Sequence, residues 1–458
     1  MTAPMRLCAA TLCALLALAR PAAAFDVQSH KSPNGHSFSL LPMREAAQTV
    51  VHFVWRGGDA YLPTEKGNLP ELAPVLLAQS GSTDMPITDL GTQLNAIGGG
   101  LLFYSGTDAL HGLLIGVAGK MVPAAQLMNA VMARPKFDER WLKRLQRNFV
   151  ENVTKDQATT GGQAWRALRE AGMGNHPLKQ VRSKTPAENI NKITIADIKD
   201  WHRRSLSTGN LGIFAAGPAT AAEIGQAIDA ALQGLPAQNK RKDYAPLAMR
   251  YPGKTILLHD PKLAKSYILV AGPVPKNYAP SQEERELGMA VLGVSDQSRL
   301  HTALRTELRA TYAFSAWMSE FSRDSAVLYF QGEVDTAQVA KALHTIETTY
   351  TTLRQEGISA VEFPFAKRLY ANRAKTMVFQ PKDAANMMAE AWLTNRSPVQ
   401  GLGYAQRATA LQRAAVNRVI ATQFPSFDSM TKIVVSPDAK AVQADCVITH
   451  FTQAARCW

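Results

Sequence analysis

Two periodicities alternate along the chain, and together they predict a mixture of strands and helices. Short runs in which apolar residues dominate or alternate with polar ones predict strands, at His36–Pro42, Thr49–Arg56, Leu110–Ala118, Thr255–Leu258, Ser266–Val270 and Ala326–Gln331. Longer segments with helical spacing of apolar residues predict helices, at Ala124–Ala133, Asp138–Val153, Gly162–Ala171, Ile195–Arg203 and Glu284–Leu292. Thr194, followed by Asp197, predicts a capping box at the start of one helix. Strand pairs separated by helices favour the α+β class, in which each sheet carries helices on one face.

The chain contains an internal repeat. Ala125–Val131 is matched by Ala337–Leu343, and Lys143-Arg144-Leu145 is matched by Lys367-Arg368-Leu369. The strand-like segment Asn210–Ala216 has a counterpart in Met430–Ser436. Three matches in the same order indicate two homologous halves rather than a solenoid of short repeats.

The predicted domain organisation follows from this repeat. A polar, proline-interrupted stretch at 236–252 has the composition of a linker. The halves then occupy 25–235 and 253–458, each with a mostly antiparallel sheet. The 458 residues contain 46% hydrophobic and 19% charged residues, a balance typical of globular domains with substantial cores.

Residues 1–24 have the pattern of a secretory signal peptide. Arg6 provides a positive start, Leu7–Ala19 is a short apolar run, and Ala22-Ala23-Ala24 offers a cleavage site. A membrane anchor is the alternative, although the run is shorter than the ~18 residues that a span requires. We therefore expect an exported protein, in the periplasm if the source is a bacterium, with no membrane span after signal removal.

Two cysteines, Cys446 and Cys457, remain in the expected mature chain. In an oxidising compartment they are expected to form a disulfide, with two free thiols as the alternative. The net charge of +13 becomes +11 when Arg6 and Arg20 leave with the signal. Lys and Arg are scattered, so the charge indicates a solvated basic surface and no nucleic-acid partner.

Residues 67–83 have the setting of a zinc-protease helix without its chemistry. They follow a strand and the turn Gly57-Gly58, and they close on Gly81-Ser82-Thr83. This context resembles the metal-binding segment of the pitrilysin/insulinase-type (inverzincin) zinc metallopeptidase family, whose helix carries H-x-x-E-H. The five motif positions correspond to Leu72, Ala73, Pro74, Val75 and Leu76. Leucine and valine offer neither metal ligands nor a general base, so we expect no cofactor in this chain and no catalysis by this chain alone.

The resemblance implies two halves that form a clamshell, and it assigns further positions. Glu151 corresponds to the distal zinc ligand of the family, and it is either a relic of that ligand or a solvated glutamate. The segment from Gly98 to Asp108 resembles the strand that pairs with substrate, with Gly99, Gly100, Leu102 and Phe103 as candidate contacts. A glycine-bent core strand is the alternative for that segment.

The segment Ser298–Tyr312 resembles the family's arginine–tyrosine element. Arg305 and Tyr312 would bind the substrate carbonyl and stabilise the oxyanion in a partner's site, because both present donors toward negative charge. Arg309-Ala310 stands where the family has Gly-Leu, which could displace Tyr312. The alternative is a surface arginine with a core tyrosine.

Two functions follow from these expectations. The first is a non-catalytic subunit of a heterodimeric exported zinc metallopeptidase, whose homologous partner carries the zinc and which encloses a peptide substrate. The second is a peptidase-like binding or assembly scaffold of the cell envelope.

Overall fold

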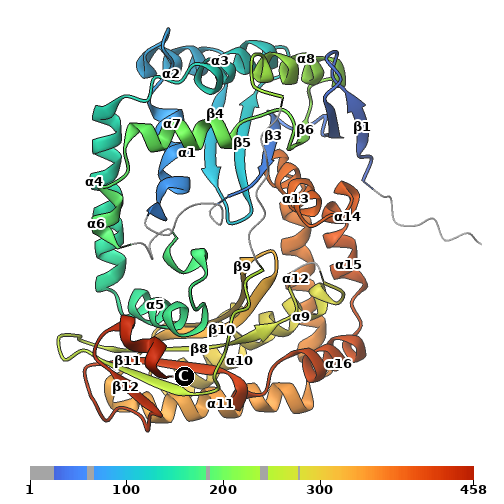
Figure 1. Ribbon diagram of the computed structural model, residues 1–458. Coiled ribbons are helices and arrows are strands. Elements are labelled where there is room, and N and C mark those ends of the chain that lie inside the picture. The colour runs from blue at the N-terminus through green and yellow to red at the C-terminus, as the bar shows by residue number, and fades with distance from the viewer. Residues whose placement is uncertain (1–24, 59–65, 182–185, 238–245, 277–278, 458) are drawn as a thin grey trace, which may run out of the picture.

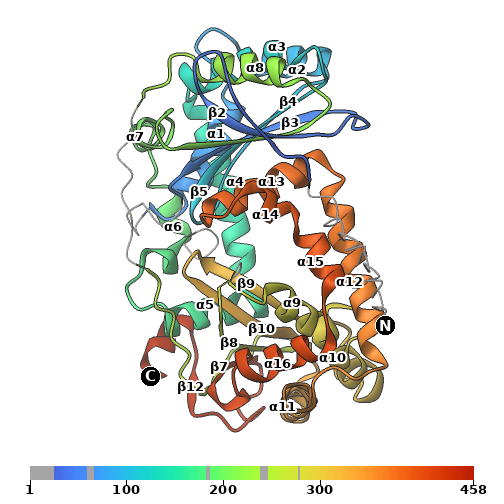
Figure 2. The same ribbon diagram turned by 90° about the vertical axis from the view of Figure 1, so that its right-hand side faces the viewer.

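The computed structural model describes residues 25–58, 66–181, 186–237, 246–276 and 279–457 (Figure 1). It contains two six-stranded sheets, one at each end of the molecule (Figures 1 and 2). All strands of the first sheet lie before the predicted linker and all strands of the second lie after it. The predicted α+β fold with two homologous halves is confirmed. The predicted signal at residues 1–24 lies outside the described residues.

Each predicted strand is present with the same or slightly changed boundaries, and three further strands, at Gln28–Lys31, Phe314–Ser322 and Cys446–Ile448, were not predicted. The first sheet has the order β1-β2-β6-β3-β5-β4 and the second has the order β12-β7-β11-β8-β10-β9. Their bounds are β1 Gln28–Lys31, β2 Ser37–Pro42, β3 Thr49–Arg56, β4 Gly100–Ser105, β5 Ala109–Gly116, β6 Leu211–Gly217, β7 Thr255–His259, β8 Ser266–Val274, β9 Phe314–Ser322, β10 Ser325–Val334, β11 Thr431–Ser436 and β12 Cys446–Ile448.

The two sheets have equivalent topologies. Reading both orders from the second strand onward pairs β2 with β7, β6 with β11, β3 with β8, β5 with β10 and β4 with β9. In each sheet the first of these strands runs parallel to the second, and the following pairs are antiparallel. The repeat seen in the sequence is therefore a repeat of the whole sheet, and β4 and β9 are equivalent edge strands.

The helices connect and cover the sheets. The capping box predicted at Thr194 is present on α7, where the Thr194 and Asp197 side chains satisfy each other's backbone N–H groups. The bounds are α1 Leu69–Gln79, α2 Ile87–Ala96, α3 Met121–Ala133, α4 Glu139–Ala158, α5 Thr160–Gly172, α6 Ala187–Ile190, α7 Ile195–Ser205, α8 Ala221–Leu232, α9 Gln282–Met289, α10 Arg299–His301, α11 Val339–Glu356, α12 Glu362–Val378, α13 Pro381–Leu393, α14 Pro398–Leu402, α15 Tyr404–Ala410 and α16 Arg413–Gln423.

Each sheet is covered on its second face by a helix from the other half. α5 follows α4 in the N-terminal half, yet its buried residues Ala164, Ala167 and Leu168 pack with the C-terminal sheet. Conversely, α13 packs on β3 and β6 of the N-terminal sheet, where Ala385 and Met388 join the core. Figure 1 shows both helices beside the sheet of the opposite half. Helices were expected on one face of each sheet. In the structure the other face is covered as well, by a helix exchanged from the other half.

Specific contacts fix the exchanged helices. The Trp165 indole on α5 donates to Gln331 Oε1 on β10, with 2.8 Å between the heavy atoms. At the other end, Arg56 Nη2 on β3 donates to the Trp392 carbonyl on α13 at 2.6 Å, and its guanidinium lies 4.2 Å from the centre of the Trp392 ring. These contacts join residues that lie more than 150 positions apart, so the halves form one packed unit.

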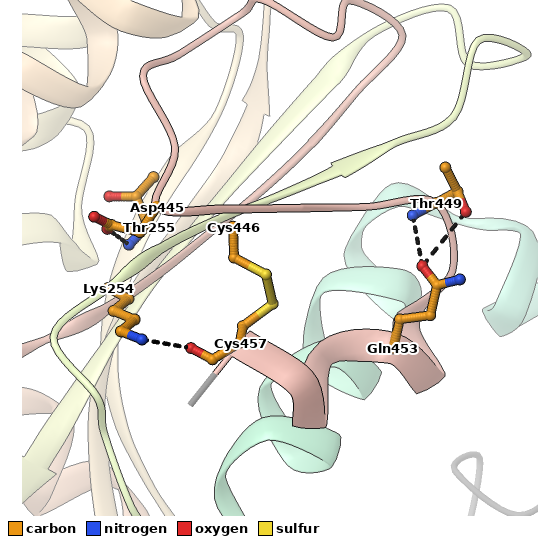
Figure 3. The surroundings of a disulfide bond; sticks show 7 residues. All are labelled: Lys254, Thr255, Asp445, Cys446, Thr449, Gln453 and Cys457. Carbon is orange, nitrogen blue, oxygen red and sulfur yellow. Dashed lines mark hydrogen bonds between the residues drawn. A yellow bond between two sulfur atoms is a disulfide. The ribbon is translucent and has the colours of Figure 1, made fainter.

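The C-terminal tail is attached by a disulfide between Cys446 and Cys457, whose Cα atoms lie 5.6 Å apart (Figure 3). The bond joins β12 to the final helical turns Phe451–Cys457, which pack on α5. Lys254 Nζ donates to the Cys457 carbonyl at 3.0 Å, beside the disulfide. In the parts of the chain that are described, no helix is long and apolar enough to cross a membrane.

Candidate functional site

The helix at the degenerate metal motif, α1, is part of the hydrophobic core. Asn68 precedes it, Pro70 lies in its first turn, and Pro74 lies inside it. Leu72 and Leu76 are completely buried and Val75 is partly buried. α1 packs against β4, α4 and α7, so the positions that would hold zinc and a general base instead fill space between them. These side chains have no lone pairs to offer, and they do not fit a zinc ion.

Glu151, the candidate distal ligand, lies on the exposed side of α4. Its carboxylate accepts a hydrogen bond from Lys155 Nζ at 2.6 Å, one helical turn along. The Lys155 ammonium lowers the pKa of this carboxyl, which keeps it charged and solvated. Within the described ranges, no group of three or more His, Cys, Asp or Glu side chains could hold a metal ion.

The candidate substrate strand, β4, lies at the edge of the N-terminal sheet and pairs with β5 alone among the described strands. Gly98 has φ of 62°, and the N–H of Gly99 donates to the Leu94 carbonyl at 2.8 Å, which closes the turn before the strand. Gly100 begins the strand itself. Leu102 is 39% exposed, whereas Phe103 is buried in the core. The strand has the edge position that backbone pairing with a peptide requires. It also packs on the core through Phe103, as expected for the alternative, a glycine-bent core strand.

Arg305 and Tyr312 lie together in the C-terminal half. The Arg305 guanidinium lies 4.5 Å from the centre of the Tyr312 ring, and Nη1 donates to His301 Nε2 at 3.1 Å. Tyr312 is 78% exposed, so the interpretation that it is a core residue is wrong. The pair presents a guanidinium and a phenol from one surface, which is the arrangement that charge stabilisation needs.

The turn between Arg305 and Tyr312 forms although it contains no glycine. Arg309 has φ of 56°, the left-handed conformation that glycine adopts most readily. The following N–H, of Ala310, donates to the Leu304 carbonyl at 2.9 Å and closes the turn. Arg309-Ala310 therefore does not separate Tyr312 from Arg305, although a left-handed arginine is strained.

The Ser298-Arg299-Leu300 part of this segment has a positioning role. Arg299 donates from Nε and Nη2 to the two carboxylate oxygens of Glu362, at 2.9 and 2.8 Å, and also to the Gly357 carbonyl. These hydrogen bonds lower the pKa of Glu362 to about 2. Leu300 is buried beneath them. The ion pair thus holds the helical turn that carries Arg305 against the start of α12.

A buried polar cluster between the N-terminal sheet and α13 was not foreseen from the sequence. His52 on β3 and His111 on β5 lie with Nε2 and Nδ1 3.0 Å apart, and Tyr104 stacks on His111 with ring centres 4.5 Å apart. Burial and the neighbouring His111 lower the pKa of His52 well below its usual value. Burial and the charge of Asp108 raise the pKa of Glu390, on α13, to about 7. Strand register brings His52, Tyr104 and His111 together, and the packing of α13 on the sheet adds Glu390, so no local motif could have identified the cluster.

One family model matches part of the chain. A sequence model of the family described as "Peptidase M16 inactive domain" matches residues 192–370. No curated protein matches the chain in sequence.

Solved structures match nearly the whole chain. An M16 inactive domain from Pseudomonas fluorescens superposes with a TM-score of 0.79 at 18% identity, covering 90% of this chain and 99% of its own. A protease from Helicobacter pylori gives 0.79 at 16% identity, covering 91% and 100%. The periplasmic protease PqqL from Escherichia coli gives 0.69 at 14% identity, and the match covers 94% of this chain but 50% of PqqL.

The family resemblance predicted from the sequence is confirmed. Residues 192–370 match the model of the Peptidase M16 inactive domain, and 90% of the chain shares the fold of a solved M16 inactive domain.

Proposed function

We propose that this chain is the non-catalytic subunit of a heterodimeric zinc metallopeptidase, and that it completes the site of a homologous, zinc-bearing partner. The observation that carries the proposal is the contrast between the two candidate elements. The metal positions Leu72 and Leu76 are buried hydrocarbon, whereas Arg305 and Tyr312 are paired and accessible. The chain can thus offer hydrogen-bond donors to a reaction for which the motif positions on α1 supply no metal ligand.

The chemical role of the pair follows from its groups. Attack on a peptide carbonyl places negative charge on the carbonyl oxygen, and donors already directed at that oxygen stabilise the transition state more than the ground state. Arg305, oriented by His301, and the exposed Tyr312 hydroxyl would supply these donors in trans. The edge strand β4 would contribute backbone groups to the wall that encloses the peptide.

Export to a periplasm belongs to the same proposal. Residues 1–24 have the pattern of a secretory signal, and the Cys446–Cys457 disulfide suits an oxidising compartment. One structural neighbour, PqqL, is a periplasmic protease.

The test is co-expression with an exported relative that carries an intact H-x-x-E-H, followed by a peptidase assay of the purified complex. Arg305→Ala and Tyr312→Phe should co-purify with the partner, yet each should lower kcat by roughly 10²–10³. Arg144→Ala is the matched control, because Arg144 also lies over an aromatic ring, that of Trp141, on exposed α4. Glu151→Gln should likewise leave kcat unchanged. Full activity of both Arg305 and Tyr312 variants would contradict the shared site.

The second candidate is a peptidase-like binding or assembly scaffold of the cell envelope without a hydrolytic role. The side chains of Leu102 and Phe103 favour it, because they are bulky at the strand that would receive a peptide. A fold neighbour with a TM-score of 0.72 at 13% identity belongs to complex III2 from Candida albicans. This match covers 92% of this chain and 98% of that one. A stable complex with the partner that shows no loss of activity in the Arg305 variant would favour the scaffold.

A further inference from the structure

The exposed side of α12 is unusually apolar. Of the large hydrophobic side chains that are exposed in the described parts of the chain, a majority lie between 361 and 379, namely Val361, Phe365, Leu369, Met377 and Phe379. Val361, Phe365, Leu369 and Met377 share one stripe, because they follow each other at multiples of four residues. Leu369, in the middle of the stripe, is 51% exposed. Arg373 is the single polar residue within it.

A groove runs beside this stripe. A cavity of about 350 Å³ lies between α12 and the π-helical turn Ala290–Val294. Val291 and Val294 line one wall, Phe365 and Leu369 line the other, and Tyr370 lies beneath them. Polar side chains, among them Gln297 and Arg373, also line the cavity. The surface is therefore concave and mostly apolar, which suits the ridge of side chains on a helix.

The equivalent helix of the other half shows that the fold does not require an apolar surface here. The buried positions Leu145 and Val153 of α4 correspond to Tyr370 and Val378 of α12, an offset of 225. The sequence match of Lys143-Arg144-Leu145 with Lys367-Arg368-Leu369 gives an offset of 224, so the alignment by burial differs from it by one residue. In this alignment the stripe on α4 consists of Arg140, Arg144, Asn148 and Asn152, all polar and exposed.

The two helices also differ in how their charges are satisfied. α4 carries ion pairs along its surface, Glu139–Lys143 and Glu151–Lys155. The one acidic residue of α12, Glu362, is bound to Arg299 at the base of the groove. Arg368 and Lys375 are exposed beside the stripe and Arg373 is exposed within it, so the surface around the apolar side chains is basic.

We propose that the groove beside α12 binds an acidic amphipathic helix presented by a partner protein. Apolar residues of that helix, one turn apart, would seat against Phe365 and Leu369, and its flanking carboxylates would lie near Arg368 and Lys375. The concave shape favours a helix as the bound partner. A membrane surface would instead be bound by a protruding amphipathic helix. The inference does not depend on Arg305 and Tyr312, because they lie outside the groove lining.

The test uses a synthetic helical peptide of about 18 residues, long enough to span α12, with leucines on one face and glutamates on its flanks. Binding to the purified full chain is measured by fluorescence anisotropy. The glutamate peptide should bind saturably, and a peptide with lysine in place of every glutamate should bind at least ~10-fold more weakly at low salt. The difference should shrink in ~1 M salt, where surface charges are screened.

Variants locate the binding. Leu369→Glu, at an exposed position, should weaken binding of the glutamate peptide at least ~10-fold without changing thermal unfolding, because it places a charge in the apolar contact. Arg144→Glu, at the equivalent stripe position of α4, is the matched control and should leave binding unchanged. Three outcomes would overturn the proposal: no saturable binding, equal binding of the two peptides, or full binding by Leu369→Glu. A preference for anionic phosphatidylglycerol vesicles over the glutamate peptide would assign the surface to a membrane instead.

Discussion

The helix α1 and the segment that ends at Tyr312 differ in the side chains that they carry at the positions matched to the family's functional residues. At α1 every metal-binding position is hydrocarbon, and the helix is held by core packing with β4, α4 and α7. In the segment from Ser298 to Tyr312, exposed polar groups persist on a turn that holds Arg309 in a strained, left-handed conformation. Packing of the core explains the first element completely. It does not explain the second, and a strained exposed element suggests a role in binding.

The largest expected effect comes from restoring polarity to α1. Leu76→His should lower the free energy of unfolding by about 3–5 kcal/mol, because it leaves a polar ring in a fully packed, apolar site. Tyr312→Phe should stay within about 0.5 kcal/mol, since its hydroxyl is in water. Urea unfolding of both variants measures the contrast. A triple variant with Leu72→His, Val75→Glu and Leu76→His that folds and holds one zinc would show that α1 retains a latent site.

A second experiment concerns Glu390, a buried ionisable group that packs beneath the N-terminal sheet, and its effect on the pH dependence of stability. The pKa of Glu390 is raised from 4.5 to about 7 beneath that sheet. Its contribution to stability is present below the unfolded pKa of 4.5 and is lost as the pH rises to about 7, because the unfolded chain releases the proton first. Glu390→Gln should therefore be more stable than the wild type by about 1–3 kcal/mol at pH 8, with little difference at pH 4.

The measurement is the free energy of unfolding of both proteins across that pH range. In the Glu390→Gln variant, stability should fall as the pH falls below 6.5, since the pKa of His52 is lowered and the unfolded chain takes up the proton there. In the wild type the growing contribution of Glu390 opposes that loss between about pH 7 and 4.5. A difference between variant and wild type that does not change with pH would contradict the raised pKa of Glu390.

Removal of the disulfide should have an intermediate effect on the C-terminal half. Cys446→Ser with Cys457→Ser should lower the free energy of unfolding by about 2–3 kcal/mol, because the unfolded chain regains the freedom of a short loop. Thermal unfolding with and without a reducing agent checks this, and the reduced wild type should match the double variant. Amide exchange should increase first in β12 and in 451–457, and an increase confined to β4 would be inconsistent with the packing of the tail.

The smallest expected effect compares equivalent turns. Gly98 and Arg309 both have positive φ just before an edge strand. Arg309→Gly should stabilise the protein by about 0.5 kcal/mol, since relief of about 1–2 kcal/mol of strain exceeds the entropy cost of glycine. Gly98→Ala should destabilise it by about 1–2 kcal/mol, because its Cβ would also meet Val117 at 3.3 Å. Thermal unfolding of the pair decides whether the arginine turn is strained as the geometry indicates.

Much of the fold was accessible from the sequence because strands with continuous apolar runs, such as Thr49–Arg56, and the internal repeat are local signals. The strands β1, β9 and β12 were not predicted. β12 owes its pairing to β7, which is distant in the chain, whereas β1 and β9 pair with the strand that follows each of them, so distance does not explain why these two were missed. The exchange of α5 and α13 was also hidden. An amphipathic pattern shows that a helix has a buried face, but it does not show which sheet buries it.

The candidate site divides in the same way. The resemblance to the pitrilysin/insulinase family indicated that Leu72, Val75 and Leu76 replace metal-binding residues, and it indicated Arg305 and Tyr312 as a pair. The left-handed conformation of Arg309 could not be read from its residue type, because arginine rarely adopts it. The His52–His111 contact depends on strand register, and the apolar stripe of α12 looks like a core face until its exposure is known.

The exchanged helices also dictate the order in which the protein can be completed during synthesis. The N-terminal sheet ends at β6, but the helix that closes its second face, α13, ends at Leu393. A nascent chain that stops at the linker would therefore present an uncovered apolar sheet, exposed to aggregation and to proteases. The two halves should mature together, late, and in a single cooperative step, and neither should be obtainable as a stable fragment by cutting the chain between the sheets.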